Sequence, residues 1–399
     1  MICIGADVSK GKSTVCFLKP YGEVLHKPFE VLHTERDLKH FVELLSTLTE
    51  EARVVMESTG AYHYPVLAYL KEHGVFASLM NPLIISKYSK VALRKGKTDK
   101  LDAIMIASFG LDHWFHLADY EPASETYGEL PVLNRQYLTY ISMRIQAKVT
   151  LTNLLDRTMP GIKTLIMNRS DVPDRDKLCD FVKEYWHYDN ITCMTESEFI
   201  SSYCSWAKEK GYQASAEKAK KIYALALDGI PTLSSSTPST KMLVLEAVHV
   251  LHMIDTTLAH ILAQMRDLAK TLKEYEVVIG MHGVGEILGP RLIAEIGDVR
   301  RFHSASALVA YAGLDAPPFQ SGNFEASHRS ISKRGSSSLR RTGYEVMMYL
   351  KIAKPTEDNA VYLYMMKKES EGKAKRVAKI AALNKFLRIY YSRVKEVYA

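Results

Sequence analysis

The sequence predicts an α/β domain at the N-terminus, a helical middle that contains a coiled coil, and a mostly α-helical C-terminal domain. Short apolar segments rich in β-branched residues fill the first 80 residues, and a regular 3-4 spacing of apolar residues runs through 244–272. Short apolar or β-branched runs bounded by turn residues indicate strands, whereas apolar residues spaced three and four apart indicate helices. We therefore expect domains at 1–158, 159–275 and 276–399.

The N-terminal domain is predicted to contain a mixed sheet. The expected strands cover 2–7, 13–18, 23–32, 53–57 and 75–80, and the expected helices cover 38–45 and 64–72. The turn-forming residues 9–12 separate the first two strands and predict a hairpin. The later strands alternate with helices, which is typical of parallel pairing, so both senses of pairing should occur in one sheet.

The middle of the chain is predicted to be helical. From residue 86 the strand pattern ends, and a long helix is expected over 127–156, before the helix breakers Pro160 and Gly161. A linker rich in Ser, Thr and Pro occupies 233–240. Residues 170–240 carry no pattern to which we assign a function.

A coiled-coil seam is predicted after this linker. The apolar residues that keep the 3-4 spacing are Val244, Ala247, Leu251, Ile254, Leu258, Ile261, Met265, Leu268 and Leu272. Heptads of this kind form the contact between helices of a coiled coil. We favour a seam between two copies of the chain, and the alternative is an amphipathic helix packed inside its own chain.

Composition narrows the class of protein. Of the 399 residues 47% are hydrophobic and 24% charged, so the chain can bury a core and is neither disordered nor collagen-like. No apolar run reaches the ~18 residues of a membrane span, and the N-terminal residues do not form a signal peptide. The five cysteines include no C-x-x-C pair, which is typical of reduced thiols. We therefore expect a cytoplasmic protein that does not contact a membrane.

Basic residues are concentrated near the C-terminus. Residues 276–399 contain 20 Lys and Arg against 12 Asp and Glu, while the remainder of the chain is almost neutral. This asymmetry indicates a polyanionic partner, most often nucleic acid, and the alternative is a solvated basic surface.

Four acidic residues stand where a metal ion could be bound. Asp7 and Glu57 each lie at the end of a short apolar strand, and Asp99 and Asp102 share one helix face. Such carboxylates can bind Mg²⁺, and two ions can stabilise both oxygens of a phosphoryl displacement. Taken singly, Asp7 could be a turn residue, Glu57 a surface acid, and the pair helix-start acids favoured by the dipole.

Further residues are candidates for contact with nucleic-acid phosphate. The basic residues around the helical pair are Lys87, Lys90, Arg94, Lys95, Lys97 and Lys100. Among them we expect Lys95 and Lys97 to bind the backbone of a nucleic acid. Gly283 and Gly285 stand in a turn between two helices, where exposed backbone N–H groups suit a phosphate.

Ser321 is a second candidate centre, in a loop over 317–323 that is rich in Gly, Ser and Pro. A basic segment follows, and its residues that we expect to contact phosphate are Lys333, Arg334, Arg340 and Arg341. A serine hydroxyl is a poor nucleophile without activation, and no local base is evident, so a metal site would have to activate it. By composition alone, Ser321 is an ordinary loop serine.

These motifs, in this order, resemble those of the DEDD transposases of the insertion-sequence-110 family. The motifs are GADVSK at 5–10, MESTGAYH at 56–63, KTDKLDA at 97–103, GVG at 283–285, QSG at 320–322 and ISKRG at 331–335. The resemblance covers nearly the whole chain except for about 170–240, which is longer than we expect for the family.

The resemblance implies a RuvC-like, ribonuclease-H-like N-terminal domain and a C-terminal transposase domain with a helix-hairpin-helix-like turn. It implies that Asp7, Glu57, Asp99 and Asp102 bind Mg²⁺, and that Ser321 attacks a DNA phosphate to form a phosphoserine intermediate. It also implies a composite active site, in which different protomers of a homodimer or homotetramer supply the tetrad and the serine.

The resemblance further implies guidance by a structured non-coding RNA, the bridge RNA, which pairs with donor and target DNA. Such pairing leaves the protein to recognise backbone shape and charge. Two other functions stay open. A RuvC-like Holliday-junction nuclease would activate water with the tetrad and give Ser321 no chemical role. A catalytically silent RNA-binding scaffold would need no divalent ion, and the intact tetrad argues against it.

Overall fold

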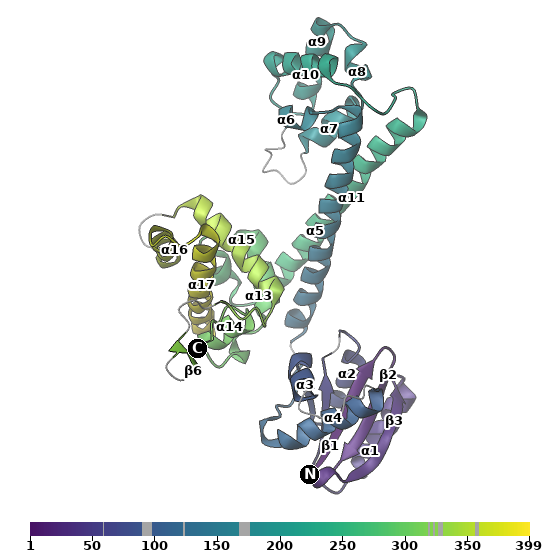
Figure 1. Ribbon diagram of the computed structural model, residues 1–399, viewed down its shortest axis with the longest axis vertical. Helices are drawn as coiled ribbons and strands as arrows, with labels where there is room; N and C mark the ends of the chain where they lie inside the picture. The colour runs from purple at the N-terminus through teal and green to yellow at the C-terminus, as the bar shows by residue number, and fades with distance from the viewer. Residues whose placement is uncertain are drawn as a thin grey trace. The chain divides into compact units, whose positions relative to one another are not determined.

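The structure is a computed structural model of the chain (Figure 1). It describes residues 1–58, 60–89, 98–122, 124–166, 176–317, 320–321, 324–325, 330–355 and 359–399. The chain divides into two compact units, Met1–Pro122 and Ala123–Ala399. The long helix that we expected at the end of the first domain therefore belongs to the second unit.

The first unit is a mixed sheet with helices on both faces. Its strands are β1 (Ile2–Ser9), β2 (Lys12–Leu18), β3 (Val24–Leu32), β4 (Ala52–Glu57) and β5 (Ala77–Met80), and its helices are α1 (Glu35–Ser46), α2 (Tyr64–Glu72), α3 (Pro82–Ser89) and α4 (Asp99–Asp112). The strand order is β3-β2-β1-β4-β5, in which β1 pairs antiparallel with β2 and parallel with β4. The predicted strands and the mixed sheet are confirmed.

The alternation of side chains along β1 separates two cores. Ile2, Ile4, Ala6 and Val8 pack with apolar residues of α1 and α2 on one face of the sheet. Cys3 faces the other way, into a second cluster that includes residues of α4. Both faces of the strand are buried, which explains why β1 reads as a continuous apolar run rather than an alternating one.

The second unit is almost entirely helical. Its helices are α5 (Glu125–Thr158), α6 (Ile162–Leu165), α7 (Lys177–Glu184), α8 (Asp189–Thr192), α9 (Glu196–Glu209), α10 (Ala216–Asp228), α11 (Pro238–Lys270), α12 (Tyr275–Ile279), α13 (Gly285–Ile296), α14 (Ala305–Tyr311), α15 (Ser337–Ala353), α16 (Ala360–Ser370) and α17 (Lys375–Val397). A hairpin of β6 (Gln320–Ser321) and β7 (Phe324–Glu325) lies between α14 and α15. The predicted fold class, α/β followed by a largely helical chain, is confirmed.

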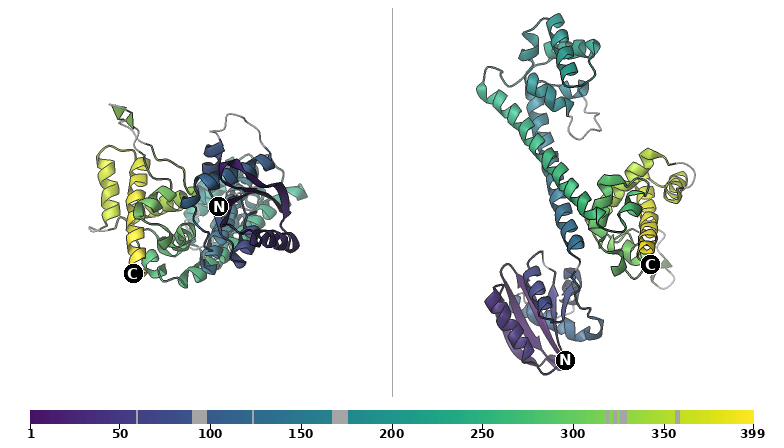
Figure 2. Two further views of the ribbon diagram at one scale, coloured as in Figure 1. Left: turned by 90° about the horizontal axis from the view of Figure 1, so that it is seen from below. Right: turned by 180° about the vertical axis from the view of Figure 1, so that it is seen from behind.

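The two longest helices, α5 and α11, lie side by side and run antiparallel (Figures 1 and 2). The C-terminal part of α5 and the N-terminal part of α11 share one apolar core with α7, α9 and α10. Their opposite ends share another core with α12, α13, α15 and α17. The segment 170–240, to which we assigned no function, thus includes small helices packed on one end of the helix pair.

The heptad seam of α11 packs inside the chain, so our preference for an intermolecular seam is wrong. Leu251 is 2% exposed and Leu258 is 7% exposed, both within the cores that α11 shares with α5. The alternative of an amphipathic helix packed in its own chain is what the structure shows. The 3-4 spacing marks the apolar face correctly but does not specify which helix covers it.

By length and average apolarity α11 could also cross a membrane, which a search for uninterrupted apolar runs does not reveal. One such helix is weak support for a membrane protein, because a core helix meets the same criteria. Within α11 Asp255 forms an ion pair with Arg144 of α5, in keeping with a helix that packs on a protein neighbour.

Candidate active site

Two predicted acidic residues come from neighbouring parallel strands. The register of β1 and β4 pairs Ala6 with Met56, so the next position places Asp7 opposite Glu57. Because paired residues of parallel strands point to the same face, both carboxylates lie on one side of the sheet, with strands ~4.8 Å apart. Each residue is half-buried. The sequence prediction that the two strand ends meet is thus consistent with the register.

The helix α4 lies directly on β1, on the face that carries these carboxylates. A Cβ added to Gly5 would lie 2.2 Å from the carbonyl oxygen of Ala103, and one added to Gly110 would lie 2.3 Å from Cys3 Sγ. The helix therefore runs antiparallel to β1, since its later residue meets the earlier strand residue. Only glycine permits so close an approach at Gly5.

This arrangement brings the start of α4 to the end of β1. Four residues of helix, from Ala103 back to Asp99, span ~6 Å, and two residues of strand, from Gly5 to Asp7, span ~6.6 Å in the same direction. Asp99 and Asp102 occupy the first turn of α4, and the hydroxyl of Thr98 accepts a hydrogen bond from the Leu101 amide. All four acidic residues therefore belong to one corner of the first unit.

The corner has a pocket beside Asp99. Its volume is about 480 Å³, and its lining residues are Thr14, Phe29, Glu30, Thr98, Asp99 and Lys100. Strand pairing sets Thr14 between Asp7 and Glu30 in one row across the sheet. The Lys12 ammonium lies 2.5 Å from Glu30, and this hydrogen bond and charge, followed by the charge of Asp99, raise the pKa of Lys12. Sequence reasoning missed Glu30, because nothing distinguishes it from other polar residues of β3.

The chemistry of these side chains fits a hard divalent cation. Partly exposed carboxylate oxygens are the ligands that Mg²⁺ takes, together with water and phosphate oxygens. Within the described residues, however, no three Asp, Glu, His or Cys side chains are close enough together to bind one ion. The four acidic residues thus lie in one corner of the first unit, but their side chains are farther apart than the ligands of a formed metal site. Lys95 and Lys97, together with Lys90 and Arg94, lie outside the described residues.

Ser321 belongs to the second unit and ends strand β6, which pairs it with Phe324 of β7. We expected a loop here, and the structure has a short hairpin. Its base is anchored by backbone hydrogen bonds, from the Ser332 amide to the Asp315 carbonyl at 2.8 Å and from the Lys333 amide to the Gly313 carbonyl at 3.0 Å. The hairpin that carries Ser321 thus projects from two segments held side by side.

The four predicted basic residues differ in their surroundings. Lys333 and Arg334 are exposed. Arg340 donates to the carbonyl oxygens of Ala312 at 2.9 Å and Gly335 at 3.2 Å, so its guanidinium also stabilises the base of the Ser321 hairpin. Arg341 lies 3.4 Å from Glu345, one helical turn further along α15.

The glycine turn joins α12 to α13, as the sequence predicts. Gly283 and Gly285 have φ values of 84° and 59°, in the left-handed region that favours glycine. A Cβ at Gly283 would lie 2.8 Å from the Val346 carbonyl oxygen, whereas nothing lies within 4 Å of one at Gly285. Gly283 therefore packs tightly against α15, whereas Gly285 has open space beside it.

Comparisons with known proteins agree on one family. Residues 4–160 match the DEDD transposase family of IS110 elements, and residues 275–362 match the transposase IS116/IS110/IS902 family. A pilin gene-inverting protein of Moraxella lacunata is 23% identical over 98% of this chain and 95% of its own length. An uncharacterised 44.8 kDa protein of insertion element IS116 from Streptomyces clavuligerus is 24% identical over 80% of this chain and 77% of its own.

Among solved structures, RuvC of T. thermophilus in complex with a Holliday junction substrate aligns with 29% of this chain and 96% of its own, at 15% identity and a TM-score of 0.23. The two family matches carry the assignment. Together they span more than half of the chain, and they include the acidic corner in one region and Ser321 in the other. The chain therefore belongs to the IS110 family of DEDD transposases, enzymes of DNA phosphoryl transfer.

Proposed function

We propose that the protein cleaves and exchanges DNA strands in a Mg²⁺-dependent reaction through a covalent phosphoserine intermediate. The observation that carries the proposal is the shared corner of Asp7, Glu57, Asp99 and Asp102, formed by two adjacent strand ends and the first turn of α4. These residues would hold the metal, which when bound supplies charge stabilisation for phosphoryl transfer.

The serine would act as the nucleophile. A bond forms between the Ser321 hydroxyl oxygen and phosphorus while the bond from phosphorus to one sugar oxygen breaks. The serine proton passes to a base, and the leaving sugar oxygen takes up a proton. One phosphoester replaces another, so a second strand can reverse the step without a nucleoside triphosphate. The location of Ser321 on an anchored hairpin supports this role.

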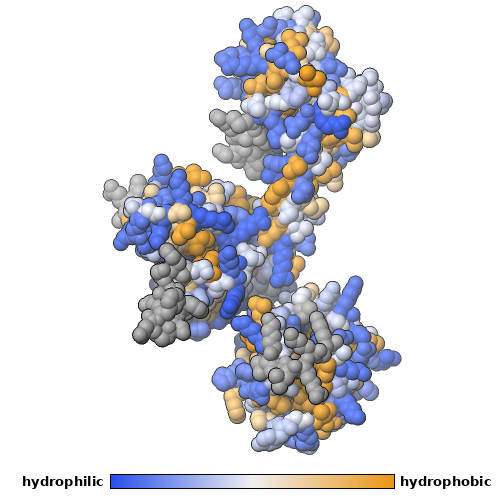
Figure 3. All heavy atoms as spheres, in the orientation of Figure 1, coloured by the Kyte–Doolittle hydropathy of each residue, from blue (hydrophilic) through white to orange (hydrophobic). Residues whose placement is uncertain are grey.

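We propose that the active site is composite and that the protein acts as a homodimer or homotetramer. Because the heptad seam is used inside the chain, a second copy would have to cover other apolar residues of α5 and α11, some of which show in Figure 3. The exposed candidates are Met143, Ile145 and Val149 on α5, and Met242, Leu243, Val250 and Met253 on α11. Their number supports a contact there.

We also propose that a structured non-coding RNA selects the DNA sites. The basic C-terminal third and the exposed Lys333 and Arg334 support contact with nucleic-acid backbones. The names of the Moraxella relatives describe inversion of a pilin gene, which supports recombination at defined sites for this chain as well.

The test is a search for protein that stays attached to DNA under denaturing conditions. The purified protein is incubated with its guide RNA, substrate DNA and Mg²⁺, the reaction is quenched, and adducts are separated on a denaturing gel and mapped by peptide mass. We expect an adduct at Ser321 and none with Ser321→Ala. Mapping to Ser332 or Ser336 would keep the mechanism and reject the residue.

The alternative is a RuvC-like Holliday-junction nuclease that uses metal-activated water. Cleavage at the wild-type rate by Ser321→Ala, without an adduct, would establish that alternative. Substitution of Asp7 separates both enzymes from a silent RNA-binding scaffold, since either enzyme would lose cleavage and a scaffold would keep its only activity, RNA binding.

A further inference from the structure

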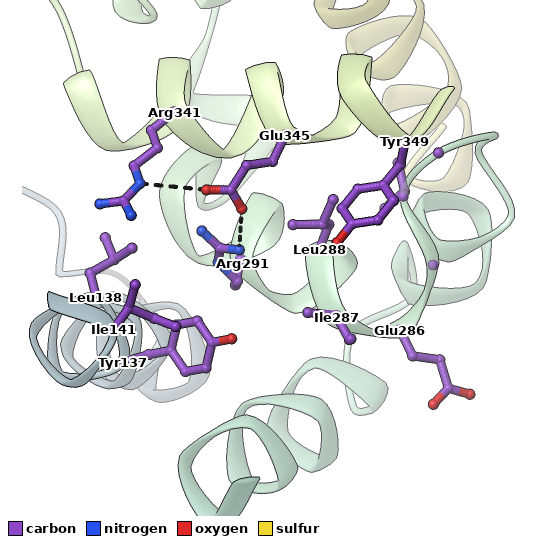
Figure 4. A pocket seen from close by; sticks show the side chains of 13 residues that line it. Tyr137, Leu138, Ile141, Glu286, Ile287, Leu288, Arg291, Arg341, Glu345 and Tyr349 are labelled. Atoms are coloured by element: carbon purple, nitrogen blue, oxygen red, sulfur yellow. Dashed lines mark hydrogen bonds and ion pairs between the residues drawn. The ribbon is translucent and has the colours of Figure 1, made fainter. Parts of the chain in front are cut away.

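A pocket in the second unit lies between α5, the glycine turn and α15 (Figure 4). Its volume is about 580 Å³, and its lining residues include Tyr137, Ile287, Leu288, Arg291, Glu345 and Tyr349. None of these residues belongs to the acidic tetrad or to the Ser321 hairpin. The pocket is therefore separate from the residues that we assign to metal binding and to nucleophilic attack.

The walls of the pocket are mostly apolar and include two tyrosines. Tyr137 of α5 is 8% exposed, and Tyr349 of α15 is 58% exposed at the other side. Ile287, which is 51% exposed, and the buried Leu288 add aliphatic surface. A flat ring could therefore stack on Tyr349 and contact the aliphatic side chains beneath it.

The polar part of the pocket is a chain of three charges. The Arg291 guanidinium lies 2.6 Å from Glu345, whose other carboxylate oxygen lies 3.4 Å from Arg341 (Figure 4). Arg291 is only 4% exposed and lies 5.3 Å from the Tyr137 ring centroid. Its Nε has no hydrogen-bond partner within the described part of the chain. A buried donor of this kind can be satisfied by an acceptor on a bound molecule.

The rim of the pocket suits an anion. The helix α13 begins at Gly285, and its N-cap residue Val284 has no side-chain acceptor for the first backbone N–H groups. Gly285 also lines the pocket, is exposed and leaves open space where a Cβ would be. Helix N-termini that are open in this way bind phosphate through backbone N–H groups and the helix dipole.

We propose that this pocket binds one unpaired nucleotide of a bound nucleic acid, with the base inside and its phosphate at the start of α13. Glu286, an acidic residue in the first turn of α13 that also lines the pocket, forms an ion pair with Arg266 at 3.2 Å. With that carboxylate paired, the charge left over from the Arg291–Glu345–Arg341 chain is positive and complements the phosphate. The side chains of this chain also offer donors and acceptors to a base edge. The inference rests on the proposed function, because it needs a nucleic-acid substrate or guide.

The test compares binding of two hairpin DNAs that differ in one position. One carries a single bulged adenine, the other an abasic residue at the same bulge, and both are measured by fluorescence anisotropy in EDTA to prevent cleavage. Wild-type protein should bind the adenine bulge about ten-fold more tightly, the effect of one stacked base. The matched RNA hairpins form a second arm that tells whether the nucleotide comes from DNA or from RNA.

Two variants of α15 make the test specific. Tyr349→Ala should bring the ratio of the two affinities close to one. Ile352→Ala should keep the wild-type ratio, because Ile352 is 72% exposed and does not line the pocket. A bulged 2-aminopurine gives a direct readout, since stacking on Tyr349 should quench its fluorescence in the wild type and less in Tyr349→Ala.

The outcomes separate this inference from the proposed function. Equal affinity of the wild type for adenine and abasic hairpins, with normal strand cleavage, would overturn the pocket alone. Failure to bind either hairpin would count against the proposed function as well. If Tyr349→Ala changes the sedimentation of the protein but not the affinity ratio, the pocket is a protein-docking surface and the inference is wrong.

Discussion

Replacing Gly5 by alanine should disturb the acidic corner without touching any acidic residue. The new Cβ would lie 2.2 Å from the Ala103 carbonyl oxygen and 2.3 Å from the Ala107 amide nitrogen. Both are backbone atoms of α4, so no side-chain rotation can relieve the overlap. Since carbon and oxygen need over 3 Å in a close-packed interior, α4 must move away from β1 by roughly 1 Å.

Two effects follow from this displacement. Overpacking of a well-packed interface costs about 1–3 kcal/mol of unfolding free energy. Asp99 and Asp102 move with α4 while Asp7 and Glu57 stay on the sheet, and misplacing reacting groups by ~1 Å can cost about 100-fold in rate. We expect Gly5→Ala to fold with reduced stability in urea and to lose about two orders of magnitude in single-turnover strand cleavage.

Gly110→Ala is the matched control. Its Cβ would meet Cys3 Sγ at 2.3 Å and Val55 Cγ2 at 2.9 Å, which are side-chain atoms three turns from the start of α4. We expect a similar loss of stability and a smaller loss of cleavage. If Gly5→Ala cleaves at the wild-type rate and its stability changes by less than ~0.5 kcal/mol, α4 does not position the acids as we argue.

Three further predictions follow from the structure. Asp102→Ala should abolish Mg²⁺-dependent cleavage while circular dichroism stays unchanged, and near-wild-type cleavage would reject the metal site. Neutralising exposed Lys333 and Arg334 together should lower the salt slope of duplex-DNA binding by up to ~1.8 for all sequences alike, whereas an effect on one sequence only would indicate base recognition. Tyr127→Phe removes a hydrogen bond of 2.5 Å to the buried carboxylate of Glu274, so urea denaturation should show a loss of ~1.5–3 kcal/mol, and an unchanged midpoint would contradict the bond.

The sequence contained enough information to predict the sheet and to identify the four acidic residues at strand ends and at the start of a helix. Apolar runs bounded by turn residues locate β1 and β4, and the spacing of Asp99 and Asp102 places them on one helix face. Periodicity could not reveal the partner of the α11 seam, because a helix from the same chain and one from another copy bury the same face. The hairpin at Ser321 was equally hidden, since two-residue strands leave almost no pattern.

The glycines show most clearly what the local sequence does not predict. In sequence Gly283 and Gly285 are equivalent, and both are expected to expose backbone N–H groups to a phosphate. In the structure Gly283 lies against the backbone of α15, so the absence of a side chain there serves packing, whereas Gly285 is exposed at the first turn of α13. A phosphate at this turn should therefore contact the amides from Gly285 onward. The same distinction applies to Gly5, which is needed because α4 passes over it and not because β1 turns there.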